Sequence, residues 1–144
     1  MQHARFIFQT LPNTALAVTK AAAGPLRWTL ISANNRRIGN CTDGYPTYLE
    51  CRGAVLNLQA GAARLTSAQI VDDRSGRMSW LIELDGIPVA ESSRSYLRAR
   101  ECAYNLERFL DSVPVAEITS GVQVVRHHGL PPPPQPPVPK EIRR

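Results

Sequence analysis

The chain has 144 residues, of which 43% are hydrophobic and 20% are charged, and its formal net charge is +5. This composition is too apolar for a wholly disordered chain, and the length allows one domain with a modest core. No apolar run approaches the ~20 residues that a membrane-spanning helix needs. We therefore expect one domain, or two small lobes that share a core, and no membrane contact.

The positive charge lies mainly outside the predicted domain. Residues 27–120 contain 11 arginines and 11 acidic residues, so the excess comes from the two ends of the chain. Within that range, residues 27–66 sum to +3 and residues 67–120 to −3. A nucleic-acid-binding domain usually carries its cations on the folded surface, because phosphate neutralisation supplies most of its affinity. Nucleic-acid binding by the basic flanks and the basic first half is therefore the alternative hypothesis.

The cysteines indicate a reducing compartment. Cys41, Cys51 and Cys102 are odd in number and lack the spacing of a metal site or a disulfide framework. We expect buried thiols on the two helices, and the exposure of Cys41 is left open. The first residues lack the continuous apolar core of a secretory signal. We therefore expect a cytoplasmic protein.

Short apolar runs predict strands in the first half of the chain, at residues 5–9, 27–31, 38–42 and 64–71. The connection that ends at Pro25 is expected to hold a short helix over residues 15–23. The polar residues 34–37 predict a turn between the second and third of these strands.

Similar runs predict strands in the second half, at residues 79–83, 89–93, 115–119 and 123–125. Asp85-Gly86 lies between the first two and predicts a type I′ hairpin, whose two central residues need positive φ. Residues 72–77 have the oxygen-rich composition of half a calcium loop. They lack its alternating acidic ligands, so we predict a turn without a metal.

Each half also contains one predicted helix with a single apolar stripe. The stripes are Cys51, Val55 and Leu58 in the first helix, and Cys102, Leu106 and Phe109 in the second. Thr47 and Glu50 predict a capping box at the start of the first helix, and Ser95 is the expected cap of the second. Gly53 costs about 1 kcal/mol relative to alanine inside a helix, so we expect a close packing contact there.

The two halves repeat one order of elements, in which a tryptophan-containing strand is followed by a hairpin, a tyrosine, a helix and a further strand. We predict an α+β fold of two tandem β-β-β-α-β repeats that form one antiparallel sheet with both helices on one face. The expected divisions are residues 1–25 for the first strand and its connection, 26–66 and 67–120 for the two repeats, and 121–144 for an extra strand and a disordered proline-rich tail.

This order resembles the YegP-like family, whose typical repeat runs Tyr-Arg-Trp/Phe-x-Leu, a turn, Gly-Tyr-Ser-Ser-Lys and a helix containing Asn-Gly-Ile. The matching segments are Arg27-Trp28-Thr29-Leu30, Gly44-Tyr45-Pro46-Thr47, Trp80-Leu81-Ile82 and Ser95-Tyr96-Leu97-Arg98, with Asn105-Leu106 as a looser match. Tyr48 and Ala99 replace the family's lysine, and Gly53-Ala54 replaces its Asn-Gly. The resemblance covers residues 6–120 or so. It implies a shared sheet in which the closing strands of the units are exchanged, and it implies no enzymatic activity.

The two tryptophans are candidate core anchors. Trp28 and Trp80 each alternate in phase with the other apolar residues of their strands, so each indole is expected on the buried face. Leu106 and Phe109 are the matching anchors on the second helix. The alternative is a stacking pair for bases or a ligand.

No catalytic signature is found in the sequence, which lacks a glycine-rich phosphate loop, a serine nucleophile elbow and paired catalytic carboxylates. The adjacent His127 and His128 would point to opposite faces of a strand and could not readily share a metal. A Cys–His pair would need an exposed Cys41 near them. We therefore expect no enzyme, cofactor or metal. The enzyme hypothesis would be abandoned if no pocket gathers polar groups near Cys41, Tyr45 or Tyr96. The alternative for the two tyrosines is that each packs over the start of its helix at the rim of the domain.

The proline-rich tail is the most distinctive segment. Proline lacks the N–H and fixes φ, so the tail is expected to be a polyproline II rod. Such rods dock into aromatic grooves with little ordering cost, and a stiff spacer is the alternative. The candidate partner-binding residues are Pro131, Pro132, Pro133, Pro134, Pro136, Pro137, Pro139, Lys140, Arg143 and Arg144.

The function expected from the sequence is that of a non-catalytic binding or scaffold module, with the tail as an arm that docks onto another protein. Because both repeats lie in one chain, the sheet can close as a pseudo-dimer. We therefore expect a monomer with an internal pseudo-twofold axis, and a homodimer is the alternative.

Overall fold

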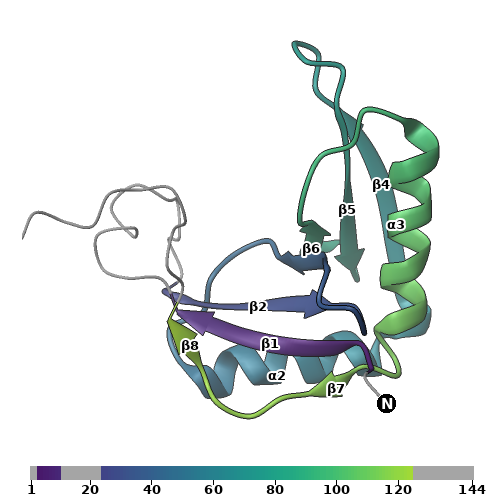
Figure 1. Ribbon diagram of the computed structural model, residues 1–144. Coiled ribbons are helices and arrows are strands. Elements are labelled where there is room, and N and C mark those ends of the chain that lie inside the picture. The colour runs from purple at the N-terminus through teal and green to yellow at the C-terminus, as the bar shows by residue number, and fades with distance from the viewer. Residues whose placement is uncertain (1–2, 11–23, 125–144) are drawn as a thin grey trace, which may run out of the picture.

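The computed structural model describes residues 3–10 and 24–124 (Figure 1). Its elements in chain order are β1 (Arg5–Thr10), β2 (Leu26–Ile31), β3 (Arg37–Cys41), α2 (Tyr48–Ala60), the short 3-10 helix η1 (Ala62–Arg64), β4 (Leu65–Val71), β5 (Met78–Leu84), β6 (Ile87–Ser92), α3 (Ala99–Ser112), β7 (Glu117–Ile118) and β8 (Gln123–Val124). The expected helix over residues 15–23, the two adjacent histidines and the proline-rich tail lie outside the described residues.

All eight strands belong to one sheet, whose order is β4-β5-β6-β3-β2-β1-β7, with β8 also pairing with β1. Strands β1 to β6 pair antiparallel, but β7 and β8 run parallel to β1. The prediction of a purely antiparallel sheet is therefore wrong. The physical reason is that β7 and β8 reach β1 from α3 rather than through a hairpin, and only a tight hairpin forces neighbouring strands to be antiparallel.

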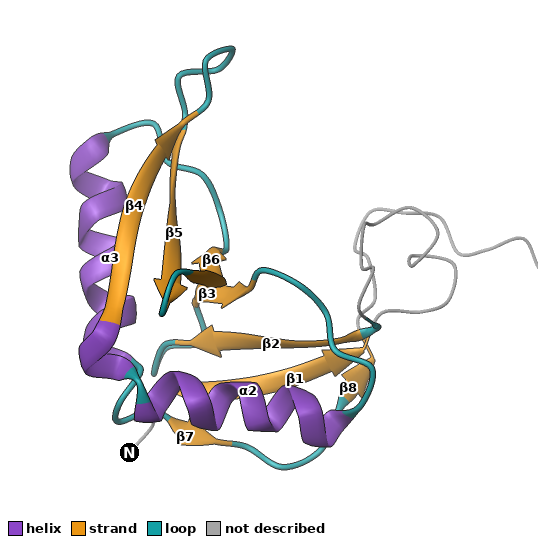
Figure 2. Cartoon of the chain, turned by 180° about the vertical axis from the view of Figure 1, so that it is seen from behind, coloured by secondary structure: helices purple, strands orange, loops and turns teal. Residues whose placement is uncertain are grey.

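The two helices cover the same face of the sheet, and each packs against a different set of strands. Figure 2 shows α2 running along β1 and β2, while α3 packs against β3 and β5. The register explains the burial, because Phe6 lies opposite Leu30 and Phe8 opposite Trp28, so that four apolar side chains share one face. All four are buried beneath α2.

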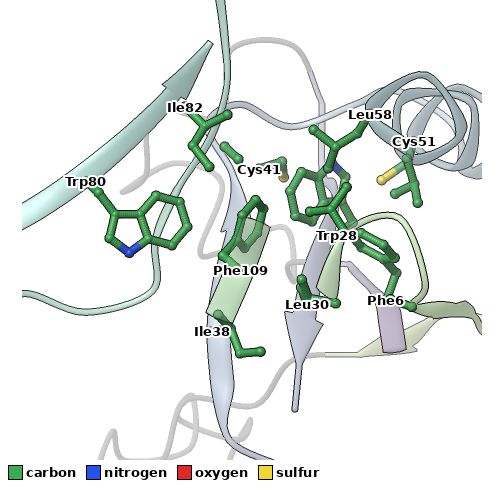
Figure 3. Packing of buried hydrophobic residues seen from close by; sticks show 14 of the residues in the cluster. Phe6, Trp28, Leu30, Ile38, Cys41, Cys51, Leu58, Trp80, Ile82 and Phe109 are labelled. Atoms are coloured by element: carbon green, nitrogen blue, oxygen red, sulfur yellow. The ribbon is translucent and has the colours of Figure 1, made fainter. Parts of the chain in front are cut away.

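Trp28, Trp80 and Phe109 form the centre of the core (Figure 3). Both tryptophans are 1% exposed and Phe109 is fully buried. Phe109 comes from α3 and packs between the indoles, with ring centroids 4.7 Å from Trp80 and 6.4 Å from Trp28. Leu106 is only partly buried and lies against this cluster. One aromatic side chain of α3 thus joins the strands of the two halves.

The starts of the two helices differ. In α2, Thr47 is the N-cap and its hydroxyl accepts a hydrogen bond from the Glu50 amide at 3.2 Å. The Glu50 carboxylate accepts from the Thr47 hydroxyl instead of reaching back to the N-cap amide, so the capping box is only half formed. The expected cap at Ser95 is wrong. The N-cap of α3 is Arg98, without a side-chain bond, because the Ser95 hydroxyl accepts from Arg77 Nε at 2.7 Å.

Two turns behave as their sequences predict. Asp85 and Gly86 have φ of 53° and 82°, the positive values that a type I′ hairpin needs. Between β4 and β5, the Asp72 carboxylate accepts from the Ser75 hydroxyl at 2.8 Å and the Arg74 amide at 3.1 Å. These bonds lower the pKa of Asp72, with the Ser75 contact as the largest cause. Residues 72–77 therefore form a turn that is held by its own hydrogen bonds.

The described part of the chain contains no helix that is both long and apolar enough to cross a membrane.

Candidate functional site

A groove lies between α3, the β2–β3 turn and the segment that follows β6. Its volume is about 810 Å³, and we call it the arginine groove. Five arginines and one carboxylate are among its lining side chains, which are Ser32, Arg36, Arg37, Ile38, Ser93, Arg94, Tyr96, Arg100, Glu101, Tyr104, Asn105 and Arg108.

One face of α3 supplies a row of three groove residues. Arg100, Tyr104 and Arg108 are spaced by four, so they lie one above the other on the helix surface. All three are exposed. The opposite face of α3 carries the buried Cys102 and Phe109, and this burial fixes which way the row points. The core of the protein therefore orients the cationic face of the helix.

The β2–β3 turn supplies the opposite wall. The Ser32 hydroxyl is buried and accepts a hydrogen bond from the Arg36 amide at 3.2 Å while it donates to the Asn34 side chain. Asn35 has a φ of 65°, which completes the tight turn. These local bonds hold the backbone that carries Arg36 and Arg37 into the groove.

Two arginines lie over tyrosine rings at the groove. The Arg94 guanidinium carbon is 5.2 Å from the centroid of Tyr96, and that of Arg108 is 5.8 Å from the centroid of Tyr104. The two rings differ, because Tyr96 is 8% exposed and Tyr104 is 59% exposed. Burial raises the pKa of the Tyr96 hydroxyl. The buried Tyr96 ring thus packs beneath the Arg94 guanidinium. The exposed Tyr104 ring contacts Arg108 and keeps a face open to solvent.

The floor of the groove contains polar atoms that the protein itself does not use fully. Asn105 Oδ1 accepts a hydrogen bond from Trp80 Nε1 at 2.7 Å, so its amide nitrogen remains as a donor on the groove side. The Ser93 hydroxyl is buried and has no hydrogen-bond partner among the described residues. A buried hydroxyl without a partner is uncommon, and Ser93 is one of the residues that line this groove.

The groove is suited to bind an anion. Arginine stays protonated at any physiological pH and offers a planar fork of donors that matches phosphate or carboxylate oxygens. Glu101 is the sole carboxylate of the lining, and it lies 4.0 Å from Arg98 in an exposed ion pair. Such a pair contributes little energy and leaves the positive field of the groove largely uncancelled.

A second groove lies between α2 and the β5–β6 hairpin, and we call it the α2 groove. Its volume is about 690 Å³, and its lining residues are Trp28, Tyr45, Glu50, Gly53, Ala54, Asn57, Leu58, Arg64, Leu84, Asp85, Ile87 and Val89. Its one arginine, Arg64, is bonded to Asp85 at 3.3 Å. Burial, with a smaller contribution from neighbouring thiols, raises the pKa of Tyr45 to about 12. The α2 groove therefore has no cationic character.

The cysteines are not placed for chemistry. Cys41, Cys51 and Cys102 are free thiols, and all three are buried. Burial is the main cause that raises the pKa of each, to about 12 for Cys51. Cys41, whose exposure the sequence left open, is 0% exposed. No group of three potential metal ligands occurs within residues 3–10 and 24–124.

The net charge of each half of the chain does not indicate the arginine groove. Arg94, Arg100 and Arg108 belong to the half of the chain whose net charge is −3, yet the fold gathers them beside Arg36 and Arg37 of the basic half. The spacing of Arg100, Tyr104 and Arg108 by four was the available signal, since it predicts a basic stripe on one helix face.

Comparisons with known proteins point to a fold. No known family model matches the sequence, and no curated protein matches it either. Two solved structures are similar. One is the protein of unknown function yegP from E. coli, with 10% identity and a TM-score of 0.61 over 86% of this chain and 94% of that one. The other is the UPF0339 protein SO3888 from Shewanella oneidensis, with 11% identity and a TM-score of 0.61 over 87% and 95% of the two chains. The chain therefore has the fold of these proteins, and the resemblance to the YegP-like family is confirmed at the level of the fold.

Proposed function

We propose that the protein is a non-catalytic binding module whose arginine groove holds a phosphate-bearing ligand. One observation carries this proposal, namely the convergence of five guanidinium groups from three separate segments on one groove. Like charges that line one groove repel each other and destabilise the folded chain, unless a ligand of opposite charge neutralises them. The arrangement therefore resembles a site prepared for an anion.

The groups of the arginine groove support binding better than catalysis. Polar groups do gather near Tyr96, which is the condition that keeps the enzyme hypothesis open. Catalysis of proton transfer needs a group whose pKa lies near the working pH. Arginine does not titrate there, and burial moves the Tyr96 hydroxyl further from neutrality. The groove thus offers donors and charge, but no poised acid, base or nucleophile.

Single-stranded nucleic acid is the ligand that fits the groove best. Its phosphates match the guanidinium forks, and its unstacked bases match the free ring face of Tyr104 next to Arg108. A groove of about 810 Å³ has room for one or two nucleotides. The alternative hypothesis of nucleic-acid binding is therefore favoured over the scaffold hypothesis, with the folded domain rather than the basic flanks as the principal surface.

Fluorescence anisotropy with a labelled single-stranded oligonucleotide tests this function. The triple variant Arg94→Gln, Arg100→Gln, Arg108→Gln should weaken binding by at least about tenfold at low salt. The slope of log Kd against log salt should fall by about 2, since each lost phosphate contact removes about 0.7 for single strands. Inorganic polyphosphate serves as a competitor that carries phosphate without bases.

The control variant carries the same charge change away from the groove. Arg52→Gln, Arg64→Gln, Arg74→Gln removes three exposed or half-buried cations that do not line the arginine groove. It should keep most of the affinity and most of the salt slope. Equal losses in both variants would mean that net charge alone attracts the oligonucleotide. Absence of binding by the natural chain to either polymer would overturn the proposed function.

The tail is proposed as a separate docking arm for another protein. Its seven prolines between residues 131 and 139 and its terminal basic residues support this idea, because a preformed polyproline II rod is recognised at low entropic cost. A pull-down that compares the full chain with a chain ending at Leu130 tests it. Partners retained equally by both chains would contradict a docking role. The thermal stability of the domain should be the same in both.

We also propose that the domain consists of two matched β-β-β-α-β units that exchange their closing strands. Two isolated bridges support this, because Leu26 pairs with Tyr45 just as Met78 pairs with Tyr96. In each case the strand that carries the buried tryptophan is tied to the tyrosine before the helix by two backbone hydrogen bonds. The strand β7 follows the second helix but pairs with β1 of the first half instead of with β6 of its own half. This is the arrangement expected of an exchanged strand.

A further inference from the structure

The strand β4 forms an edge of the sheet that the described chain leaves open. It is the outermost strand next to β5, and no described strand lies beyond it. Six of its seven residues are exposed, including Ile70 at 47% and Val71 at 56%. An outward row of unpaired N–H and C=O groups along a strand is a template for another strand.

The opposite end of the sheet is closed. There, β1 pairs with both β7 and β8, which cover its outer hydrogen-bonding groups. The aromatic residues Phe6 and Phe8 of β1 are buried, while β4 presents Ser67 and Gln69 at the corresponding positions opposite β5. The fold therefore caps one of its two edges and leaves the other free.

The usual devices that protect an open edge are missing from β4. Its sequence, Leu-Thr-Ser-Ala-Gln-Ile-Val, contains no lysine, no proline and no charged residue of any kind. Its pairing with β5 runs through all seven residues without a bulge. A strand of this composition is compatible with pairing to a second strand of the same sequence.

We propose that a second copy of this chain pairs with β4 through its own β4, in antiparallel orientation about a twofold axis at Ala68. The axis stands perpendicular to the sheet, so both copies present the same face on the same side. Leu65 of each copy then lies opposite Val71 of the other, and Thr66 opposite Ile70. These are apolar and β-branched cross-strand pairs of the kind that stabilise antiparallel sheets.

The charges that flank β4 select this register. Residues on the same face of the sheet must lie opposite each other, so only shifts by two residues are allowed. With Ala68 on the axis, Arg64 of one copy and Asp72 of the other, which flank β4, come together just beyond each end of the strand pair, where Asp72 would compete with Asp85 for the Arg64 guanidinium. A shift in one direction would place Arg64 opposite Arg74, and a shift in the other would place it opposite Ile70. Both are unfavourable compared with an ion pair.

The chain already contains an antiparallel junction between two similar halves. The two halves meet where β3 and β6 pair antiparallel, with Gly39 opposite Ser92 and Cys41 opposite Ala90. Both helices lie on one face on either side of that junction. Pairing of β4 with β4 would extend the sheet by an equivalent junction, so that the two copies of α3 flank the new strand pair on the same face.

Size-exclusion chromatography with light scattering, up to millimolar chain concentration, tests the proposal on the full chain. The natural chain should form a concentration-dependent dimer. Ala68→Lys and Ala68→Glu each place two like charges opposite each other on the axis, and each should raise the dimer dissociation constant by at least about tenfold. Ala68 is exposed, so neither variant should lose its fold. An equimolar mixture of the two variants should form the heterodimer, because the introduced ammonium group of one copy meets the introduced carboxylate of the other.

The matched control is Ala60→Lys, which adds the same charge at an exposed position on α2. It should dimerise like the natural chain. Three results would overturn the proposal: a natural chain that stays monomeric throughout, an Ala68→Lys variant that still dimerises, or a mixture that fails to restore the dimer. Hydrogen exchange adds a fourth: if the outward-facing β4 amides, which are not bonded to β5, were protected independently of concentration, something other than a second copy would cover the edge.

Discussion

The arginine groove and the α2 groove occupy corresponding places, yet they have opposite chemical character. Each lies between one helix and the hairpin that precedes the other helix, and each contains the tyrosine that leads into its own helix. The arginine groove has five cations and one carboxylate, whereas the α2 groove has one arginine that is bonded to Asp85. The backbone is thus compatible with either character, and side chains alone decide it.

Three aligned helix positions show how side chains of different size and polarity line the two grooves. When Cys102 is aligned with Cys51, Tyr104 corresponds to Gly53, Asn105 to Ala54 and Arg108 to Asn57. The α3 residue in each pair is larger and carries a donor or a ring that faces its groove. The core residues behind them differ less, since Phe109 takes the place of Leu58 and both are buried. The two helices therefore expose different side chains over a similar buried core.

Replacement of Trp80 by alanine should produce the largest effect. Trp80 is 1% exposed, packs 4.7 Å from Phe109 and donates to Asn105 in the floor of the arginine groove. We expect Trp80→Ala to lower the free energy of unfolding by about 3–5 kcal/mol, as measured by urea denaturation. Because Asn105 would lose its partner, oligonucleotide affinity should fall as well.

Trp28→Ala is the matched variant for the α2 side. Trp28 is equally buried and lines the α2 groove. Its loss should cost a similar free energy and leave the oligonucleotide affinity of the folded fraction unchanged. A negligible loss of stability in Trp80→Ala would contradict its role as a core anchor and favour a surface stacking role.

A smaller loss is expected when Gly39 gains a methyl group. A Cβ at this position of β3 would lie 2.5 Å from Cη2 of Trp80 and 2.8 Å from Cδ2 of Phe109. Gly39→Ala should therefore cost about 1–3 kcal/mol through overpacking, measured by the same denaturation. The corresponding residue of β6 is Ala90, whose methyl group the buried core already accommodates. Ala90→Gly should cost only about 1 kcal/mol, and an unaffected Gly39→Ala would show that the two rings can separate.

Local patterns predicted the elements of this fold well. The alternation around Trp28 and Trp80, the Asp85-Gly86 hairpin and the apolar helix stripes depend on interactions between residues close in sequence. The parallel pairing of β7 with β1 depends on where α3 delivers the chain, which no local pattern encodes. The predicted cap at Ser95 is wrong for the same reason, since Arg77, at the start of a strand far from Ser95 in sequence, donates a hydrogen bond to the Ser95 hydroxyl.

The candidate site was harder to predict than the fold. A sum of charges along the sequence treats neighbours in the chain as neighbours in space. The arginine groove instead joins Arg36 and Arg37 to residues of the second half, which becomes visible only when β3 and β6 are known to pair. The helix stripe through Tyr104 was present in the sequence, but its apolar opposite face drew the interpretation toward the core.

Alkaline pH should destabilise the folded chain, in part through the buried groups Tyr45 and Cys51 beside α2. The pKa values of Tyr45 and Cys51 are about 12, raised mainly by burial from usual values of 10.0 and 9.0. The folded chain therefore keeps protons that the unfolded chain loses, so the free energy of unfolding should fall as the pH rises from about 9 to about 12. Urea denaturation at several pH values measures this decline.

Tyr45→Phe removes one of these protons and should make the decline shallower. Tyr104→Phe is the control, because Tyr104 is largely exposed on the other groove and should leave the pH dependence unchanged. An identical decline in all three chains would contradict the assignment to the buried tyrosine of the α2 side.

The smallest effect is expected at Gly53, where the sequence predicted a close packing contact. That prediction is wrong, because a Cβ at Gly53 would meet no heavy atom within 4 Å. The position opens into the α2 groove, whereas the corresponding Tyr104 forms part of the arginine groove wall. Gly53→Ala should therefore stabilise the chain by about 0.5–1 kcal/mol, since alanine favours the helix and nothing opposes its methyl group.

Gly61, at the end of the same helix, provides the contrast. A Cβ there would approach Cδ1 of Leu84 to 2.6 Å, so Gly61→Ala should destabilise the chain where Gly53→Ala stabilises it. Thermal denaturation of both variants measures the two signs. If Gly53→Ala proved destabilising, the α2 groove would have to close around that residue in solution. The two grooves would then differ in charge but not in the space that Gly53 and Tyr104 leave.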